Sequence, residues 1–79
     1  MITAHQWKNR RVRNKVKEEI NSLRVSHEME WLTPYQCRVE GILDLYPTNR
    51  KFHNLITGHR GIFADVLECI ENEIREAYL

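Results

Sequence analysis

The chain has 79 residues, of which 42% are hydrophobic and 29% are charged, and its formal net charge is +1. A chain of this length buries too little surface to enclose a large catalytic cavity, so any site is expected to be shallow. The composition excludes a disordered tail and predicts a single soluble domain that spans residues 1–79.

Charge is distributed unevenly along the chain. The first 17 residues carry six cations and no acid, whereas residues 62–79 carry five acids and one cation, Arg75. This asymmetry has two interpretations. It favours either attraction between two antiparallel helices or separate basic and acidic docking faces.

The first predicted element is a basic helix over residues 4–25. Thr3 and Gln6 have the spacing of a capping box, which places the start of the helix near Ala4. Apolar residues then recur at helical spacing and form one narrow stripe. They are Val12, Val16, Ile20 and Leu23.

Residues 26–34 are predicted to be a connector, because they show no sustained period and end at Pro34. A three-stranded antiparallel meander is expected over residues 35–57, where apolar and polar residues alternate around two turns. Pro47 closes the second strand, since proline cannot donate to a central ladder.

The turn at Glu40-Gly41 allows two registers for the first hairpin. A two-residue type I′ turn requires a positive φ at Glu40, which is unfavourable for glutamate. A three-residue loop with Gly41 in a left-handed bulge avoids that requirement. The sequence leaves both alternatives open.

The last predicted element is an amphipathic helix over residues 62–78. Its apolar positions follow helical spacing, with the acids on the opposite side. They are Phe63, Val66, Leu67, Ile70 and Ile74. We expect this helix to cover the sheet, which predicts an α+β fold ordered as helix, three strands, helix.

Residues 35–61 carry a hairpin glycine, an Asp-x-aromatic-Pro-Thr sequence and a later glycine turn before a helix. Their sequence is YQCRVEGILDLYPTNRKFHNLITGHRG. This pattern resembles small uncharacterised proteins of bacteriophages and prophages. The matching positions are Gly41, Asp44, Tyr46, Pro47, Thr48, Lys51, His53 and Gly61. The resemblance implies a phage accessory protein that binds host machinery or a host defence system, and it implies no particular reaction.

Candidate catalytic and metal-binding groups are weakly supported. Cys37, His53 and His59 lack the spacing of a zinc site, so no metal or cofactor is expected. Both thiols, Cys37 and Cys69, alternate with core positions and are expected to be buried. Asp44 is the one carboxylate within a strand; a salt bridge to Arg38 or Lys51 is favoured over a role as general base. We therefore expect no enzyme.

Two groups of residues are candidate binding surfaces. The first, on the basic helix, has enough cations to contact several phosphates. It consists of Trp7, Lys8, Arg10, Arg11, Arg13, Lys15 and Lys17. The second, here called the loop patch, offers donors and aromatic rings to an anionic or peptide ligand. It consists of Tyr46, Thr48, Asn49, Arg50, Lys51, His53, His59 and Arg60. On the other interpretation this stretch is a set of solvated turns, with Tyr46 and Phe52 in the core.

The expected function is a non-enzymatic binding module of the anti-defence kind, such as an anti-CRISPR protein. Its partner would be a host protein or a protein–nucleic acid complex, with direct nucleic-acid binding by the basic helix as the alternative. Homodimerisation is a further expectation, because the apolar stripe on the first helix is narrow and Trp7 and Trp31 are expected to be partly exposed. The sequence has neither a signal peptide nor an apolar membrane span, which predicts a cytoplasmic protein, in the host cytoplasm if a phage encodes it.

Overall fold

A computed structural model of the protein describes residues 15–79, and its centre is a five-stranded antiparallel sheet. The strands lie in chain order across the sheet, so each one pairs with its neighbours in sequence. They are β1 (Met29–Thr33), β2 (Gln36–Val39), β3 (Leu43–Tyr46), β4 (Lys51–Asn54) and β5 (Arg60–Ile62). The fold is α+β.

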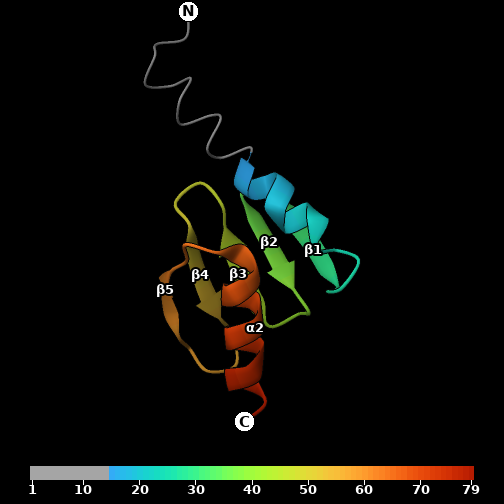
Figure 1. The fold of residues 1–79 in the computed structure, drawn as a ribbon. Helices are drawn as coiled ribbons and strands as arrows, with labels where there is room; N and C mark the ends of the chain where they lie inside the picture. The colour runs from blue at the N-terminus through green and yellow to red at the C-terminus, as the bar shows by residue number, and fades with distance from the viewer. Residues whose placement is uncertain (1–14) are drawn as a thin grey trace, which may run out of the picture.

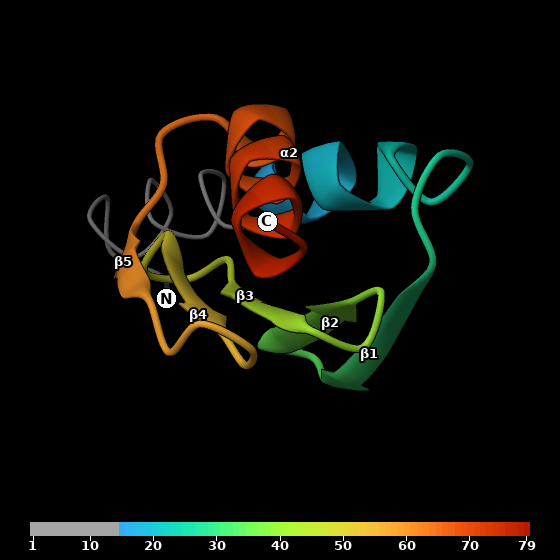
Figure 2. The same cartoon turned by 90° about the horizontal axis from the view of Figure 1, so that it is seen from below.

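Two helical segments lie on the same face of this sheet, as Figure 2 shows. The first covers residues 15–22, and the second is α2 (Val66–Ala77), which crosses the middle of the sheet in Figure 1. The protein therefore has two layers. One face of the sheet is covered by helices, and the other carries none within residues 15–79.

The prediction of a three-stranded meander is wrong, because the sheet has five strands. The predicted connector contains β1, which pairs with β2 from Met29↔Val39 to Thr33↔Gln36. The register shifts between Trp31 and Thr33. Pairing with β2, rather than a local alternation, holds this segment extended.

β5 is the other strand that the sequence did not predict, and it displaces the start of the last helix. Gly61 pairs with Phe52, and Ile62 pairs with Lys51, so these residues belong to the sheet. Asp65 then caps α2 by accepting a hydrogen bond from the Glu68 amide over 3.0 Å. The helix accordingly begins at Val66 rather than at residue 62.

The β2–β3 turn combines features of both predicted alternatives. Val39 pairs with Leu43, which leaves three residues in the loop. Glu40 nevertheless has a φ of 50° and Gly41 a φ of 71°. Glutamate thus occupies the left-handed conformation that the two-residue turn required, and the strand register is that of the longer loop.

The core lies between the sheet and the two helical segments. Val16 and Ile20 project from residues 15–22, and Val66 and Ile70 project from α2; all four are buried. Alternate strand residues meet them from the sheet. These are Cys37, Val39, Leu43, Leu45 and Phe52. Leu67, which was predicted to face the core, is 42% exposed.

The predicted basic helix is only partly within the described residues. Helical conformation ends at residue 22, three residues before the predicted end. The capping box and the residues before Lys15 lie outside the described part. Among residues 15–79 no ion pair joins the two helical segments, so the proposed charge attraction between them has no support in the described contacts.

Candidate functional site

The helix-free face of the sheet carries a row of polar side chains that crosses all five strands. Strand pairing places these residues opposite one another in turn: Glu30, Arg38, Asp44, His53 and Arg60. Because side chains alternate between the two faces of a strand, all five lie on the face opposite to the core. The row starts with alternating charges and ends at the basic edge strand β5.

Asp44 is the most enclosed member of this row. Its carboxylate accepts two hydrogen bonds from the Arg38 guanidinium, over 2.8 and 3.1 Å, and a third from the Gln36 amide over 3.1 Å. The hydrogen bond with Asp44 raises the pKa of Arg38 above its ordinary value. The Asp44 side chain is only 4% exposed. It is therefore occupied as a structural anion, and the contacts give it no free oxygen for general-base chemistry.

Beside this pair, the same face is hollowed over β3, β4 and β5. The hollow has a volume of about 570 Å³ and opens widely to solvent. Its lining includes five residues of the loop patch: Tyr46, Asn49, Lys51, His53 and Arg60. Phe52, Gly61 and Ile62 complete it. We call this the cationic hollow.

The charge of the cationic hollow is one-sided. Lys51 and Arg60 are both exposed, and no carboxylate is found among the described residues that line it. The nearest acid in the polar row is Asp44, whose charge Arg38 already offsets. Two cations that form no ion pair with any of residues 15–79, beside Tyr46 and Ile62, suit an anionic group attached to an apolar or aromatic one.

The remaining loop-patch residues lie elsewhere. Thr48 is exposed in the β3–β4 turn, outside the hollow. Arg50 has a φ of 52° and donates a hydrogen bond to the Ala64 carbonyl over 2.9 Å, which ties this turn to the segment before α2. His59 contacts Glu73 on the helix side, with Nδ1 3.1 Å from each carboxylate oxygen.

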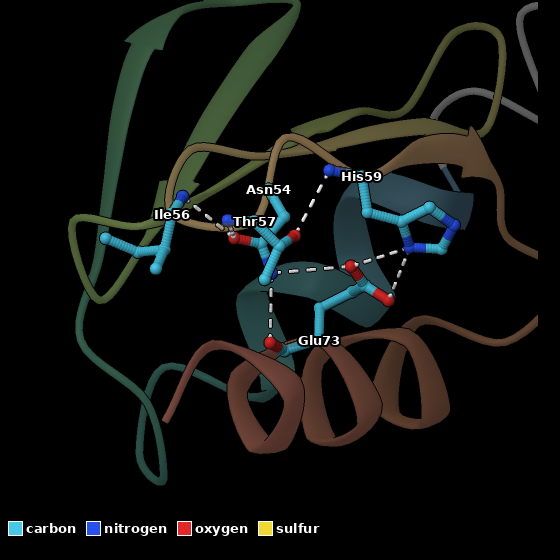
Figure 3. A network of polar contacts seen from close by, with 5 residues as sticks. All are labelled: Asn54, Ile56, Thr57, His59 and Glu73. Carbon is cyan, nitrogen blue, oxygen red and sulfur yellow. Dashed lines mark hydrogen bonds and ion pairs between the residues drawn. The ribbon is translucent and has the colours of Figure 1, made fainter. Parts of the chain in front are cut away.

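His59 belongs to a polar network on the helix side of the sheet, drawn in Figure 3. Asn54, which is fully buried, donates to the backbone carbonyl of Glu73 over 3.0 Å. Its side-chain oxygen accepts hydrogen bonds from the amides of Ile56 and Thr57. This network fixes the β4–β5 turn against α2, so its role is structural.

Of the predicted basic-helix residues, the structure describes Lys15 and Lys17. Lys15 is exposed. The Lys17 ammonium lies 5.7 Å from the ring centre of Trp31 and 5.6 Å from that of Tyr35, so it is already held by two aromatic rings. Trp31 also donates a hydrogen bond to Asn21. The other five members lie outside the described residues: Trp7, Lys8, Arg10, Arg11 and Arg13.

The thiols and the metal-binding candidates give no reactive centre in the described part of the chain. Burial raises the pKa of Cys37 to about 11 and that of Cys69 to about 12, so both are protonated at neutral pH. Within residues 15–79, no group of three histidine, cysteine or acidic side chains is arranged to hold a metal ion.

Ile62 is a site residue that the sequence reasoning missed. It lies on the helix-free face in β5, lines the cationic hollow and is 75% exposed. A signal was present in the alternation of Arg60, Gly61 and Ile62 directly after the Gly58 turn. The predicted last helix, over residues 62–78, takes Ile62 out of this strand.

No helix in residues 15–79 has both the length and the apolar character needed to cross a membrane. Comparisons of the chain with protein-family models, with curated proteins and with solved structures found no match.

Proposed function

We propose that this protein is a non-enzymatic binding module that occupies an anionic surface of a host macromolecular complex and so inhibits or redirects it. The proposal is carried by one observation: the cationic hollow is open and exposes Lys51 and Arg60 with no lining carboxylate in the described residues. Electrostatic complementarity of this kind speeds association and excludes partners of the wrong charge.

The condition of the candidate catalytic groups supports binding rather than catalysis. Cys37 and Cys69 are buried with raised pKa values, and Asp44 is held by Arg38 and Gln36. The role of a phage accessory protein of the anti-defence kind rests on the sequence resemblance around Asp44 and Tyr46. It therefore stands as part of the proposal.

The experiment is capture of partners from a nuclease-treated bacterial lysate by the tagged protein, which tests for a protein partner. We expect a stoichiometric protein partner that survives nuclease treatment. Replacing both cations of the cationic hollow, Lys51→Glu with Arg60→Glu, should abolish capture. A matched pair on other exposed positions, Arg24→Glu with Arg75→Glu, changes the net charge equally and should leave capture intact.

The alternative is direct nucleic-acid binding by the basic N-terminal residues, which the six cations of the first 17 residues favour. In that case nuclease treatment would remove all captured material. Neutralising Arg10, Arg11 and Arg13 to alanine would also flatten the salt dependence of binding to an oligonucleotide. The protein-partner proposal would be rejected by either of these two results if, in addition, the double substitution of Lys51 and Arg60 had no effect on capture.

A further inference from the structure

Within residues 15–79, no strand pairs with the outer edge of β5, so its backbone hydrogen-bonding groups are open on that side. β5 is the last strand of the sheet (Figures 1 and 2). The Asn54 amide donates to the His59 carbonyl, and the Phe63 amide donates to the Arg50 carbonyl. Because inward and outward backbone groups alternate along an antiparallel strand, the N–H and C=O groups of Arg60 and Ile62 point away from β4.

The two edges of the sheet differ in how open they are to another strand. β1, at the other edge, has an irregular register between Trp31 and Thr33 and is followed at once by Pro34. Such features discourage strand addition. β5 keeps a regular register with β4 over its whole length and contains no proline. The edge at β5 is thus the one suited to a further strand.

A hollow lies on each side of β5. On the helix-free side is the cationic hollow, with Lys51 and Arg60. On the helix side is a smaller one of about 220 Å³, between β5 and α2. Its lining combines apolar residues, Phe52, Phe63 and Cys69 among them, with the carboxylates of Asp65, Glu68 and Glu73, so it suits an apolar side chain and not an acidic one. Successive side chains of an added strand would point alternately into these two spaces.

Gly61 favours this arrangement, because it places no side chain on the helix side of β5. A Cβ atom there would lie 3.0 Å from two ring carbons of Phe52. The strand therefore lies directly on that ring, and Gly61 adds no side chain to the small hollow, whose lining takes only Ile62 from β5.

From these observations we infer that the partner contributes an extended acidic segment, which pairs with β5 as a sixth strand of the sheet. Its side chains alternate, with acidic groups facing Lys51 and Arg60 and apolar groups facing Phe52 and Phe63. This inference rests on the proposed function and specifies the partner's docking segment. Strand addition supplies affinity through main-chain hydrogen bonds and specificity through alternate side-chain pockets.

Charge argues against a second copy of this chain as the added strand. Pairing β5 with itself about a two-fold axis would put two sets of Lys51 and Arg60 on one continuous face. Like charges placed close together across strands are destabilising. An acidic segment meets the same face with opposite charge.

The direct test uses a synthetic peptide with blocked ends, Thr-Val-Glu-Val-Glu-Val-Thr, added to the whole protein. Amide hydrogen exchange followed by NMR should show the Arg60 and Ile62 amides slowed by at least about tenfold at saturating peptide. Two control peptides should not do this: Thr-Val-Lys-Val-Lys-Val-Thr, and Thr-Val-Val-Glu-Glu-Val-Thr, which breaks the alternation. Absence of binding, or binding without protection of these two amides, would overturn the inference.

The same NMR experiment is repeated with a single-stranded oligonucleotide in place of the peptide. If it perturbs Lys51 and Arg60 more strongly than the acidic peptide does, and protects neither edge amide, the surface belongs to nucleic acid. That result would also overturn the acidic-strand inference.

A backbone variant separates this inference from the proposed function. Ile62→Pro removes an outward N–H without removing a bond to β4, so the sheet should persist. It should lose partner capture at least about tenfold, whereas Ile62→Ala keeps the N–H and should lose less. If the Lys51→Glu, Arg60→Glu protein loses the partner and the Ile62→Pro protein still captures it, strand addition is rejected. That result would agree with the proposed function. If Ile62→Pro does not fold, the amide protection of the unmodified protein decides.

Discussion

Asn54 connects two parts of the structure that are far apart in sequence, the β4–β5 turn and α2. It is fully buried, and its side chain both donates to Glu73 and accepts from the turn amides of Ile56 and Thr57. A buried polar group whose hydrogen bonds are all satisfied favours the arrangement of the turn that satisfies them. The position of the β4–β5 turn then determines where β5 begins.

This contact leads to a prediction for Asn54→Ala. The substitution leaves turn amides and a helix carbonyl without partners, so it should lower the free energy of unfolding by about 2–3 kcal/mol. Urea denaturation at neutral pH, followed by circular dichroism, measures this. Asn72→Ala, at an exposed position of α2, is the matched control and should change stability by no more than about 0.5 kcal/mol. Equal effects of the two substitutions would contradict the role given to Asn54.

The two thiols predict how stability depends on pH in the alkaline range. Burial raises the pKa of Cys37 to about 11 and that of Cys69 to about 12, from an ordinary value of 9.0. The folded protein therefore holds these protons more tightly than the unfolded chain does. Their stabilising effect is complete below pH 9.0, and it is lost as the pH rises from there through 11.

Denaturation over that pH range should accordingly show a fall in stability that is reduced in the Cys37→Ala, Cys69→Ala double variant. A thiol reagent in mildly alkaline buffer should modify the native protein slowly and the unfolded protein at both cysteines. Rapid modification of the native protein would contradict the burial of these groups.

At the level of the elements, the strongly amphipathic last helix was predictable and the edge strands were not. The spacing of Val66, Ile70 and Ile74 identifies α2 locally, because one face of a helix must be buried. β1 and β5 are extended because they pair with β2 and β4, a non-local interaction that periodicity does not register. β5 is only three residues long and contains Gly61, so it has almost no local signal.

For the candidate site, too, residue type could be read from the sequence, whereas the arrangement that depends on strand pairing could not. The sequence identified Tyr46, Lys51 and Arg60 as candidates by residue type, and it is the pairing of β4 with both β3 and β5 that brings them to one face. It also grouped His59 with them, although His59 lies on the helix side, against Glu73. Which face a residue occupies depends on strand register, and register could not be read from this stretch of sequence.

The β2–β3 turn gives a prediction at this scale. Glu40 has a φ of 50°, a left-handed conformation that is costly for glutamate and milder for asparagine. Glu40→Asn also removes the contact with His27 at 3.6 Å, which is worth little at a surface position. The net effect should be a gain of about 0.5 kcal/mol in thermal or urea denaturation.

Glu28→Asn, on the exposed residue just before β1, provides the comparison. It should give no gain, because Glu28 does not have a positive φ. A loss of stability in Glu40→Asn would show that the contact with His27 outweighs the backbone strain.

At the level of the whole molecule, the two faces of the sheet have separate roles. The helix-covered face holds the core and the Asn54 network, and the helix-free face holds the polar row and the cationic hollow. Because Lys51 and Arg60 are exposed and lie outside the core, substitutions at these two positions should change binding without unfolding the protein. This separation makes the proposed function testable by surface variants.

The most direct measurement compares partner capture by the Lys51→Glu, Arg60→Glu protein with capture by the Arg24→Glu, Arg75→Glu protein. Both pairs should unfold at about the temperature of the unmodified protein, since surface substitutions change stability by about 0.5 kcal/mol or less. We expect the first pair to lose the nuclease-resistant partner and the second pair to retain it. Equal retention by both pairs, or equal loss, would contradict a binding function centred on the cationic hollow.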